Sequence, residues 1–309
     1  MKLIRGIENW PDNRQSVVTI GNFDGVHLGH QAMFASTRRL ADAHKAIATV
    51  ISFEPLPHEY FATDTAPPRL QGLRDKVQSV AACGMDRLLI LRFDQNLSAM
   101  SAEDFVKRIL KDTANARHVI VGDDFRFGHK RLGNHDLLTE LAPELGFQVT
   151  QSPTCLHDKQ RVSSTRAREY LQAGDLQRVQ ALLGRPYRIS GRVVHGEKVG
   201  RQLGFPTANV ALGKHRPPLR GVFAVWATHV PSGERYASVA NLGERPTVGG
   251  RKLLLEVHAL DRTVNWYGQH LQVDFIHHLR DEKRFASLDE LKAQIALDAE
   301  QARQMMKPN

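Results

Sequence analysis

The segment TIGNFDGVHLGHQ, residues 19–31, combines three glycines with an aspartate and two histidines in one short loop. Its flanks predict a buried strand before it and a helix over residues 31–44. A loop between a parallel strand and a helix lies at the carboxyl edge of an α/β sheet, where ligands bind, and a helix start offers free N–H groups to a phosphate. His27 and His30 are expected on one side of the first helical turn.

Two imidazoles beside glycines can hydrogen-bond the phosphates of a nucleotide and stabilise the charge that builds on a leaving pyrophosphate. The loop therefore predicts a nucleotidyl transfer site, with His27 and His30 holding the charge and Asp24 ordering the loop or the surroundings of a metal ion. The H-x-G-H pattern by itself also fits a glycine turn whose histidines bond nearby carbonyl groups, and for this motif alone that interpretation is favoured.

Two later segments favour the nucleotide site. VGDDFRFGHKRLGN, residues 121–134, follows a predicted strand and offers Asp124, Phe125 and Arg126, which can stack on an aromatic ring and hydrogen-bond its edge. RVSSTRARE, residues 161–169, sets hydroxyl groups and an arginine at a helix start, an arrangement that suits triphosphate oxygens. Each segment alone could be a cap or a turn. Three such loops in one sheet domain indicate a ligand site.

Length and composition limit the class of protein. A chain of 309 residues predicts two domains. Its net charge of +9 is scattered among acidic residues, and phosphate-bearing small substrates explain this charge as well as a nucleic acid does, with a solvated basic face as the alternative. A nucleic-acid partner is not expected. The first residues lack an apolar signal region and no run is long enough to span a bilayer, so we expect a cytoplasmic protein without a membrane partner. Two cysteines far apart predict neither a disulfide nor a zinc site.

The first half alternates strands and helices, an order that predicts a doubly wound parallel sheet of the Rossmann-like nucleotidyltransferase type. The expected strands cover 17–20, 48–55, 87–93, 118–122 and 147–151, and the expected helices between them cover 31–44, 70–83, 101–111 and 135–144. Two short helices follow and Gly184 ends them. We place a domain boundary there, between domains 1–184 and 185–309.

The second half consists of short β-rich runs separated by turns, which predicts an antiparallel β-barrel. One helix closes the chain. Its start is marked by a capping box of Ser287 and Glu290, and Leu288, Leu291 and Ile295 form the apolar stripe expected to pack on the barrel.

Motifs of both halves resemble those of the prokaryotic bifunctional riboflavin kinase/FMN adenylyltransferases, or FAD synthetases. GNFDGVHLGH, VGDDFRFG and SSTRARE are similar to the adenylyltransferase module, whereas GRVVHGEKVGRQLGFPTANV, LRGVFAV, NLGERPTVGG, LEVHALD and LRDEKRFASLDELKAQI resemble the riboflavin kinase module. The resemblance covers nearly the whole chain. It implies phosphorylation of riboflavin to FMN by ATP, then adenylylation of FMN to FAD with release of pyrophosphate.

The resemblance also implies roles for single residues, which the chemistry of the two steps supports. Riboflavin's hydroxyl is a poor nucleophile that benefits from a base and from Mg²⁺, for which Glu256 is the candidate base and Thr207 and Asn209 the candidate metal ligands. The phosphate of FMN is already ionised, so its reaction needs positioning more than a base. The other candidates are Arg166 in catalysis, Gly21, Asn22, Phe23, Asp24, Gly29, Ser164, Thr165, Gly196, Lys198, Gly200, Gly204, Phe205 and Pro206 for ATP, and Asp124, Phe125, Arg126, Arg280 and Phe285 for the flavin.

Two alternatives remain at this stage. Only one of the two halves could be active, or the chain could bind a nucleotide or RNA without turnover. Glu256 together with Thr207 and Asn209 favours an enzyme, because a binding module has no need of a base. The sequence makes no prediction of the oligomeric state.

Overall fold

The computed structural model describes residues 1–62, 65–195, 204–247, 250–262 and 264–306. The chain divides into two compact units: the first contains Met1–Pro67 and Lys76–Ser163, and the second contains Pro68–Asp75 and Ser164–Asn309. A compact unit need not coincide with a domain, so the predicted domain boundary after Gly184 stays a prediction.

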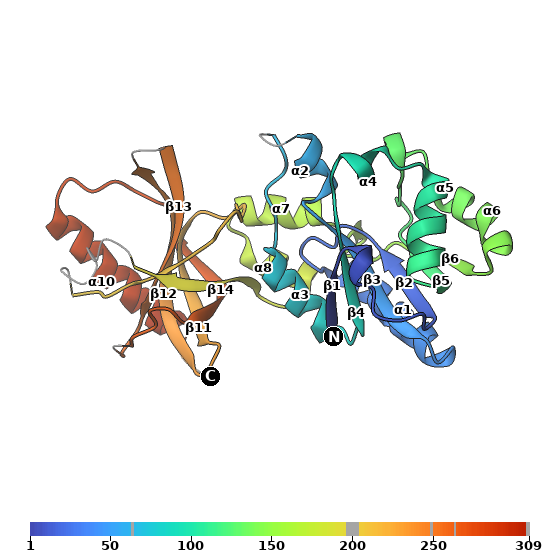
Figure 1. Cartoon of the computed structure of the whole chain (residues 1–309). Coiled ribbons are helices and arrows are strands. Elements are labelled where there is room, and N and C mark those ends of the chain that lie inside the picture. Colours follow the sequence, from blue (N-terminus) through green and yellow to red (C-terminus); the bar gives the residue numbers. More distant parts are fainter. Residues whose placement is uncertain (63–64, 196–203, 248–249, 263, 307–309) are drawn as a thin grey trace. The chain divides into compact units, whose positions relative to one another are not determined.

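A six-stranded sheet forms the first unit, and all of its strand pairs are parallel, which confirms the predicted doubly wound architecture. Its order is β1-β4-β3-β2-β5-β6, and Figure 1 shows these strands side by side. The first strand was not predicted. The bounds are β1 (Lys2–Arg5), β2 (Ser16–Ile20), β3 (Ile47–Glu54), β4 (Arg87–Arg92), β5 (Ala116–Val121) and β6 (Gln148–Gln151).

The connections between these strands contain the predicted helices and several short ones. Ser101 and Asn134 cap helix starts, accepting hydrogen bonds from the amides of Asp104 at 3.0 Å and Leu137 at 2.9 Å. Gly146 ends a helix at a φ of 73°, a left-handed conformation that favours glycine. The helices are α1 (Leu28–Ala43), α2 (Pro57–Phe61), α3 (Leu73–Ala82), α4 (Gln95–Ala99), α5 (Ala102–Phe105), α6 (His135–Leu145), the 3-10 turns η1 (Ile7–Asn9) and η3 (His129–Arg131), and the π-helix η2 (Val106–Thr113).

The strand order reverses between β2 and β5. From β2 the chain goes to β3 and β4 on one side of the sheet, whereas β5 and β6 lie on the other side. β2 and β5 are hydrogen-bonded neighbours, with Thr19 opposite Ile120, so their carboxyl ends lie next to each other. In open α/β sheets the crevice at such a reversal is the place where ligands bind. The predicted loops after residue 20 and after residue 121 both begin there.

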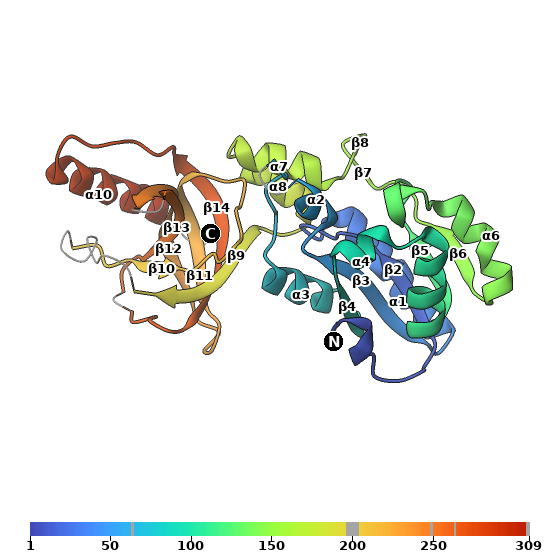
Figure 2. The ribbon, with the colours of Figure 1, turned by 45° about the horizontal axis from the view of Figure 1, so that its top comes forward.

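A closed antiparallel barrel forms most of the second unit, which confirms the predicted barrel (Figure 2). Alternate residues such as Leu255 and Val257 are fully buried, as expected when every second side chain points into the barrel. The strands are β9 (Tyr187–Val194), β10 (Ala208–Val210), β11 (Gly221–His229), β12 (Arg235–Thr247), β13 (Gly250–Ala259) and β14 (His270–Arg280). The short helices α7 (Ser164–Gln172) and α8 (Leu176–Leu183) also belong to this unit.

The last helix, α10 (Leu288–Met305), begins at the predicted cap, where the Ser287 hydroxyl accepts from the amide of Glu290 at 3.2 Å. The predicted apolar stripe is wrong at Leu288, which is 63% exposed, whereas Leu291 and Ile295 are half-buried. The fully buried core contacts come from Ala299 and Ala302 in the second half of the helix. Small side chains let a helix approach a sheet closely, so α10 packs through residues that a search for large apolar side chains overlooks.

Candidate active sites

His27 and His30 lie together at the start of α1. His27 is the residue that caps this helix, and its Nδ1 accepts a hydrogen bond from the backbone amide of His30 at 3.3 Å. The two rings are stacked, with centroids 3.6 Å apart and an interplanar angle of 17°. Because Nδ1 of His27 accepts, the proton of the neutral ring lies on Nε2. The structure thus brings the two predicted imidazoles into contact on one side of the first turn.

The environment of His30 keeps its ring neutral. Burial lowers the pKa of His30 well below 6.5, and the nearby charges of His27 and Lys76 lower it further. The edge of the Phe23 ring meets this imidazole at a centroid distance of 5.1 Å. Nδ1 of His30 is buried and has no hydrogen-bond partner. A buried ring nitrogen without a partner, at a helix start that favours anions, is typical of a ligand site.

The glycines of this loop have packing reasons as well as the predicted one of admitting a ligand. A Cβ at residue 21 would lie 3.0 Å from the ring of Phe23, and one at residue 29 would lie 3.2 Å from the ring of His27. Gly25 adopts a φ of 87°, a conformation that glycine tolerates best. Asp24 is 2% exposed in the same loop. The loop is therefore packed tightly around the two imidazoles.

Sequence reasoning missed Lys76, which fixes the same loop from α3. Its side chain is 1% exposed, and its Nζ donates to the carbonyl oxygen of Asn22 at 2.7 Å. The hydroxyl of Ser52, at the end of β3, donates to the same carbonyl at 3.3 Å. A signal was available: Lys76 occupies an inward position of α3, between Leu73 and Val80 in the i, i+3, i+4 pattern.

The second loop, after β5, presents both acidic and aromatic side chains. Thr154 and Arg161 hydrogen-bond Asp123; burial opposes ionisation there, but these two partners outweigh it and hold the pKa of Asp123 below its usual value. Arg161 also pairs with Asp124 at 3.1 Å, although the Asp124 side chain remains 78% exposed. Asp124, a predicted flavin contact, is thus held by an ion pair with Arg161, while most of its side chain remains accessible to a ligand.

The aromatic residues of this loop form a stacked pair. The rings of Phe125 and Phe127 lie 5.3 Å apart at an angle of 18°. Phe127 pairs through its backbone with Gly133, at 3.0 Å and 2.9 Å, and a Cβ at residue 133 would lie 2.7 Å from the Phe127 ring. Arg126 is exposed beside them. The loop is closed on itself, which gives the half-buried Phe125 a fixed support.

The third predicted segment begins α7. The guanidinium of Arg166 donates to the hydroxyl of Tyr170 at 2.7 Å and lies 5.4 Å from that ring. Ser164, Thr165 and Arg166 belong to the second compact unit, whereas the other two loops belong to the first. That the three segments join in one site stays a prediction.

In the barrel, Asn209, Glu256 and Asn241 lie side by side across three strands. Glu256 on β13 is directly opposite Asn209 on β10 and Asn241 on β12. Side chains at directly opposed positions share one face, with Cβ atoms about 4.5–5.5 Å apart. Thr207 directly precedes β10. The structure therefore brings the predicted base next to one predicted metal ligand.

Asn241 was missed by the sequence reasoning. Its Oδ1 atom is buried and has no hydrogen-bond partner. Its role depends on the register between β12 and β13, which joins residues fifteen positions apart in the chain, so no local pattern indicates it.

The turn before β10 is held by His258 of β13. Nδ1 of His258 lies 2.9 Å from the carbonyl oxygen of Pro206, and the ring of Phe205 meets the His258 ring at 5.4 Å, edge to face. Gly204 has a φ of 88°. These contacts hold the turn of the chain that leads into Thr207 and Asn209. The remaining predicted members of the phosphate loop, Gly196, Lys198 and Gly200, lie outside the described residues.

Two predicted flavin contacts lie near α10. The guanidinium of Arg280 pairs with Asp298, which is 4% exposed, at 2.8 Å, and lies 5.7 Å from the ring of Phe285. Gln294 donates to the same carboxylate at 2.9 Å. Arg280 thus anchors α10 to β14 and supports Phe285.

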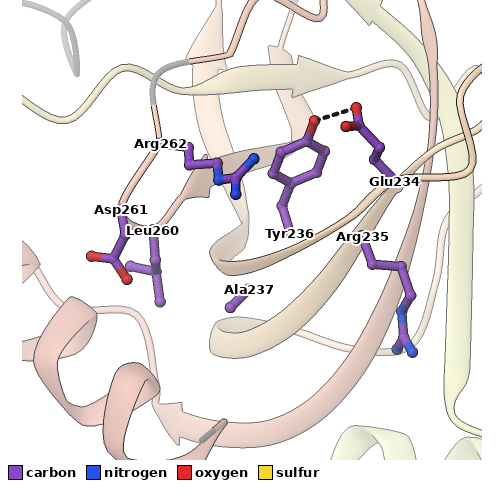
Figure 3. A pocket seen from close by; sticks show the side chains of 7 residues that line it. All are labelled: Glu234, Arg235, Tyr236, Ala237, Leu260, Asp261 and Arg262. Carbon is purple, nitrogen blue, oxygen red and sulfur yellow. Dashed lines mark hydrogen bonds between the residues drawn. The ribbon is translucent and has the colours of Figure 1, made fainter. Parts of the chain in front are cut away.

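A separate pocket of about 350 Å³ lies at the end of the barrel where β12 begins and β13 ends (Figure 3). The hydroxyl of Tyr236 donates to Glu234 at 2.7 Å, beside Arg262. No predicted site residue lines this pocket.

In the described part of the chain, no three His, Cys, Asp or Glu side chains are grouped so as to hold a metal ion. This finding does not bear on the predicted ligands Thr207 and Asn209, which would offer neutral oxygen atoms to a metal ion. Among the same residues, no helix has the length and apolar character needed to cross a membrane.

Known proteins are similar to both halves of the chain. The family model for FAD synthetase matches residues 10–166, and the model for riboflavin kinase matches residues 183–306. The bifunctional riboflavin kinase/FMN adenylyltransferase of Escherichia coli strain K12 is 46% identical over 307 residues, covering 98% of this chain and 97% of that protein. The protein of the same name from Pseudomonas fluorescens is 46% identical over 311 residues, covering 100% and 99%.

A solved structure, described as that of a macrolide-efflux protein from Streptococcus pneumoniae, is also similar. It has a TM-score of 0.83 and 27% sequence identity, over 97% of this chain and 98% of that one.

These matches in both halves make the chain a transferase with two catalytic modules. It belongs to the bifunctional riboflavin kinase/FMN adenylyltransferase family. Its activities are riboflavin kinase and FMN adenylyltransferase, and ATP is the co-substrate of both. The alternatives of a single active half or of a binding protein without turnover have no support among these findings.

Proposed function

We propose that the loop and strand residues described above divide between the two reactions of FAD synthesis, one set for each of the predicted domains 1–184 and 185–309. In this assignment the barrel domain phosphorylates riboflavin to FMN, and the first domain transfers AMP from ATP to FMN, releasing pyrophosphate. The observation that carries it is the contrast between the two sites: two stacked imidazoles at a helix start, and a carboxylate in a row of oxygen-bearing side chains.

For the adenylyl transfer, His27 and His30 hydrogen-bond the phosphates of ATP at the N-terminus of α1. The low pKa of His30 makes it a neutral hydrogen-bond partner rather than a cation. FMN brings an ionised phosphate as nucleophile, so no base is required, and orientation with charge stabilisation supplies the catalysis. Asp124, Phe125 and Arg126 contact the flavin, and Gly21, Asn22, Phe23, Asp24 and Gly29, with Ser164, Thr165 and Arg166, contact ATP.

For the phosphorylation, Glu256 accepts the proton of the riboflavin hydroxyl as that oxygen attacks the γ-phosphorus of ATP. The neutral oxygens of Thr207 and Asn209 beside this carboxylate fit Mg²⁺, which prefers oxygen ligands. When bound there, Mg²⁺ supplies positive charge to the phosphates of ATP. Asn241 offers its unpartnered Oδ1 to a hydroxyl group of the substrate. Arg280 and Phe285 support the flavin side of the site.

The direct test incubates the purified chain with riboflavin and ATP, with and without Mg²⁺, and follows FMN and FAD by chromatography under oxidising and reducing conditions. We expect both products with Mg²⁺ and neither after chelation. The absence of both products under all conditions would contradict the assignment.

We also propose the domain boundary after Gly184. The 185–309 fragment should fold and make FMN, because the barrel is closed within it. A longer fragment, 164–309, retains α8, whose Leu176, Val179, Leu182 and Leu183 are buried, and should therefore melt at a higher temperature. If the shorter fragment is folded but inactive while the longer one is active, the boundary is misplaced.

A cytoplasmic location fits the two free cysteines, Cys83 and Cys155. The small-molecule partners are riboflavin, FMN, FAD and ATP, and we propose no nucleic-acid partner. A gel-shift assay with RNA at physiological salt should show no complex; a salt-resistant complex would contradict this part of the proposal.

A further inference from the structure

We infer that Lys76 is a positioning residue of the adenylylating site: from α3 it fixes the loop after β2 through the Asn22 carbonyl and sets the charge environment of His30. This inference rests on the proposed role of that loop in FAD formation. Lys76 is absent from every motif that identified the family. It is a buried basic residue that the two-step chemistry does not otherwise use.

The first support is the burial of Lys76. Its side chain is 1% exposed, among the most completely buried side chains of the chain. A lysine is seldom buried to this extent unless its amino group has partners, because removing a charge from water costs free energy. Here Nζ donates to the Asn22 carbonyl at 2.7 Å and lies 3.4 Å from the Ser52 hydroxyl. The contacts join three segments of the sheet unit: Lys76 in α3, the end of β3 and the loop after β2.

The second support is what the Asn22 carbonyl controls. Asn22 directly precedes Phe23, which has a φ of 45° and is 2% exposed. The Phe23 ring in turn meets the His30 ring edge to face. A displacement of the Asn22 peptide therefore moves the aromatic wall against which the imidazole rests. Displacements of about 1 Å in a catalytic site can cost about 100-fold in rate.

The third support is electrostatic. The charged and titratable groups that act on His30 are His27, from its own helix start, and Lys76, from α3. Both oppose a positive charge on His30, in the same direction as burial. With Lys76 in place, His30 therefore remains a neutral imidazole whose buried Nδ1 can serve the ligand. Removing the charge of Lys76 should allow His30 to take up a proton at higher pH.

The test compares three variants of the full-length protein. Lys76→Met retains the apolar stem but removes donor and charge, Lys76→Arg retains both, and Lys107→Met removes an exposed lysine of η2 as the matched control. We measure FAD formation from supplied FMN against pH, riboflavin phosphorylation in the same samples, and the titration of the His30 ring by NMR.

We expect Lys76→Met to lower FAD formation by about 100-fold, to move the acid limb of its pH profile and the His30 titration to higher pH, and to leave phosphorylation unchanged. Lys76→Arg should recover part of the rate and retain the wild-type pH profile. Lys107→Met should behave as the wild type. FAD formation by the wild type tests the proposed function separately.

Wild-type FAD formation and an unshifted pH profile in Lys76→Met would overturn the inference. A lower melting temperature with a normal rate per folded molecule and no shift would also overturn it, since it describes a purely structural lysine. If Lys76→Met does not fold, Lys76→Arg decides: a folded protein with the wild-type pH profile and FAD formation supports the inference, and a folded protein without FAD formation contradicts it.

Discussion

The two sites of this chain use the same co-substrate in different physical settings. In the sheet unit, His27 and His30 sit at a helix start, and burial lowers the pKa of His30 well below 6.5, so that this imidazole is a weak base. In the barrel, Glu256 lies between Asn209 and Asn241 on one face of the strands. The difference follows from the nucleophile: a phosphate arrives ionised, whereas a hydroxyl must lose a proton. The state of the nucleophile therefore determines which residues a phosphate-handling site needs.

The largest effect should come from removing the barrel's carboxylate. Glu256→Gln preserves size and hydrogen-bonding shape but cannot accept a proton, so single-turnover phosphorylation of riboflavin at saturating ATP should fall by about 10²–10⁴-fold. FAD formation from supplied FMN should persist. A near-normal rate in a protein shown by melting to be folded would exclude Glu256 as the base. The search would then turn to two other carboxylates of the barrel half: Asp261, which lines the pocket of Figure 3, and Glu282, whose pKa is raised by burial.

A loss of about 100-fold is expected from either His27→Ala or His30→Ala, and it should affect only FAD formation from FMN, because a charge-stabilising hydrogen bond is removed. Steady-state rates of both reactions in the same preparation provide the measurement. Equal losses in the two reactions would show that the imidazoles do not belong to one site.

A smaller effect, about tenfold on riboflavin phosphorylation, is expected from Asn241→Ala, since one hydrogen bond to the substrate is worth about 1.5 kcal/mol. The KM for riboflavin should rise while FAD formation stays unchanged. The exposed Glu140→Ala in α6 is the matched control. An unchanged KM and kcat would remove Asn241 from the site.

The smallest effect concerns stability and pH. The pKa of His30 is below 6.5 in the folded protein, so between that folded value and 6.5 the unfolded chain binds a proton that the folded chain does not. The free energy of unfolding is therefore unaffected by His30 above pH 6.5. Below pH 6.5 it falls as the unfolded chain takes up this proton, by at most about 1.4 kcal/mol per pH unit.

His30→Asn should lose less stability than the wild type over that acidic range, as measured by urea unfolding of both proteins at several pH values. Parallel curves for the two proteins would contradict the neutral, buried state of His30.

Local features were predictable from the sequence. Ser101, Asn134 and Ser287 cap helices as expected, because a cap depends on residues three positions apart. Features that depend on distant partners were not. The strand β1 has four residues and exists through its pairing with β4, where Lys2 lies opposite Arg87.

The sites show the same division between local and distant information. His27 and His30 belong to one short motif, so their proximity could be predicted. Lys76 and Asn241 have partners that only folding supplies: the Asn22 carbonyl in the loop after β2, and Glu256 on β13. The prediction for Leu288 in α10 failed for a related reason, because large apolar residues indicate a buried face only when nothing smaller packs better.

The central claim, that each of the predicted domains 1–184 and 185–309 holds one complete set of reacting groups, is tested most directly by complementation between two variants. Glu256→Gln and His30→Ala are supplied with riboflavin and Mg-ATP, singly and mixed, and the flavins are separated by chromatography. We predict no FMN or FAD from Glu256→Gln, FMN without FAD from His30→Ala, and FAD from the mixture, because FMN released by one variant is adenylylated by the other. A mixture that makes FMN but no FAD, while Glu256→Gln alone is folded, would contradict the account.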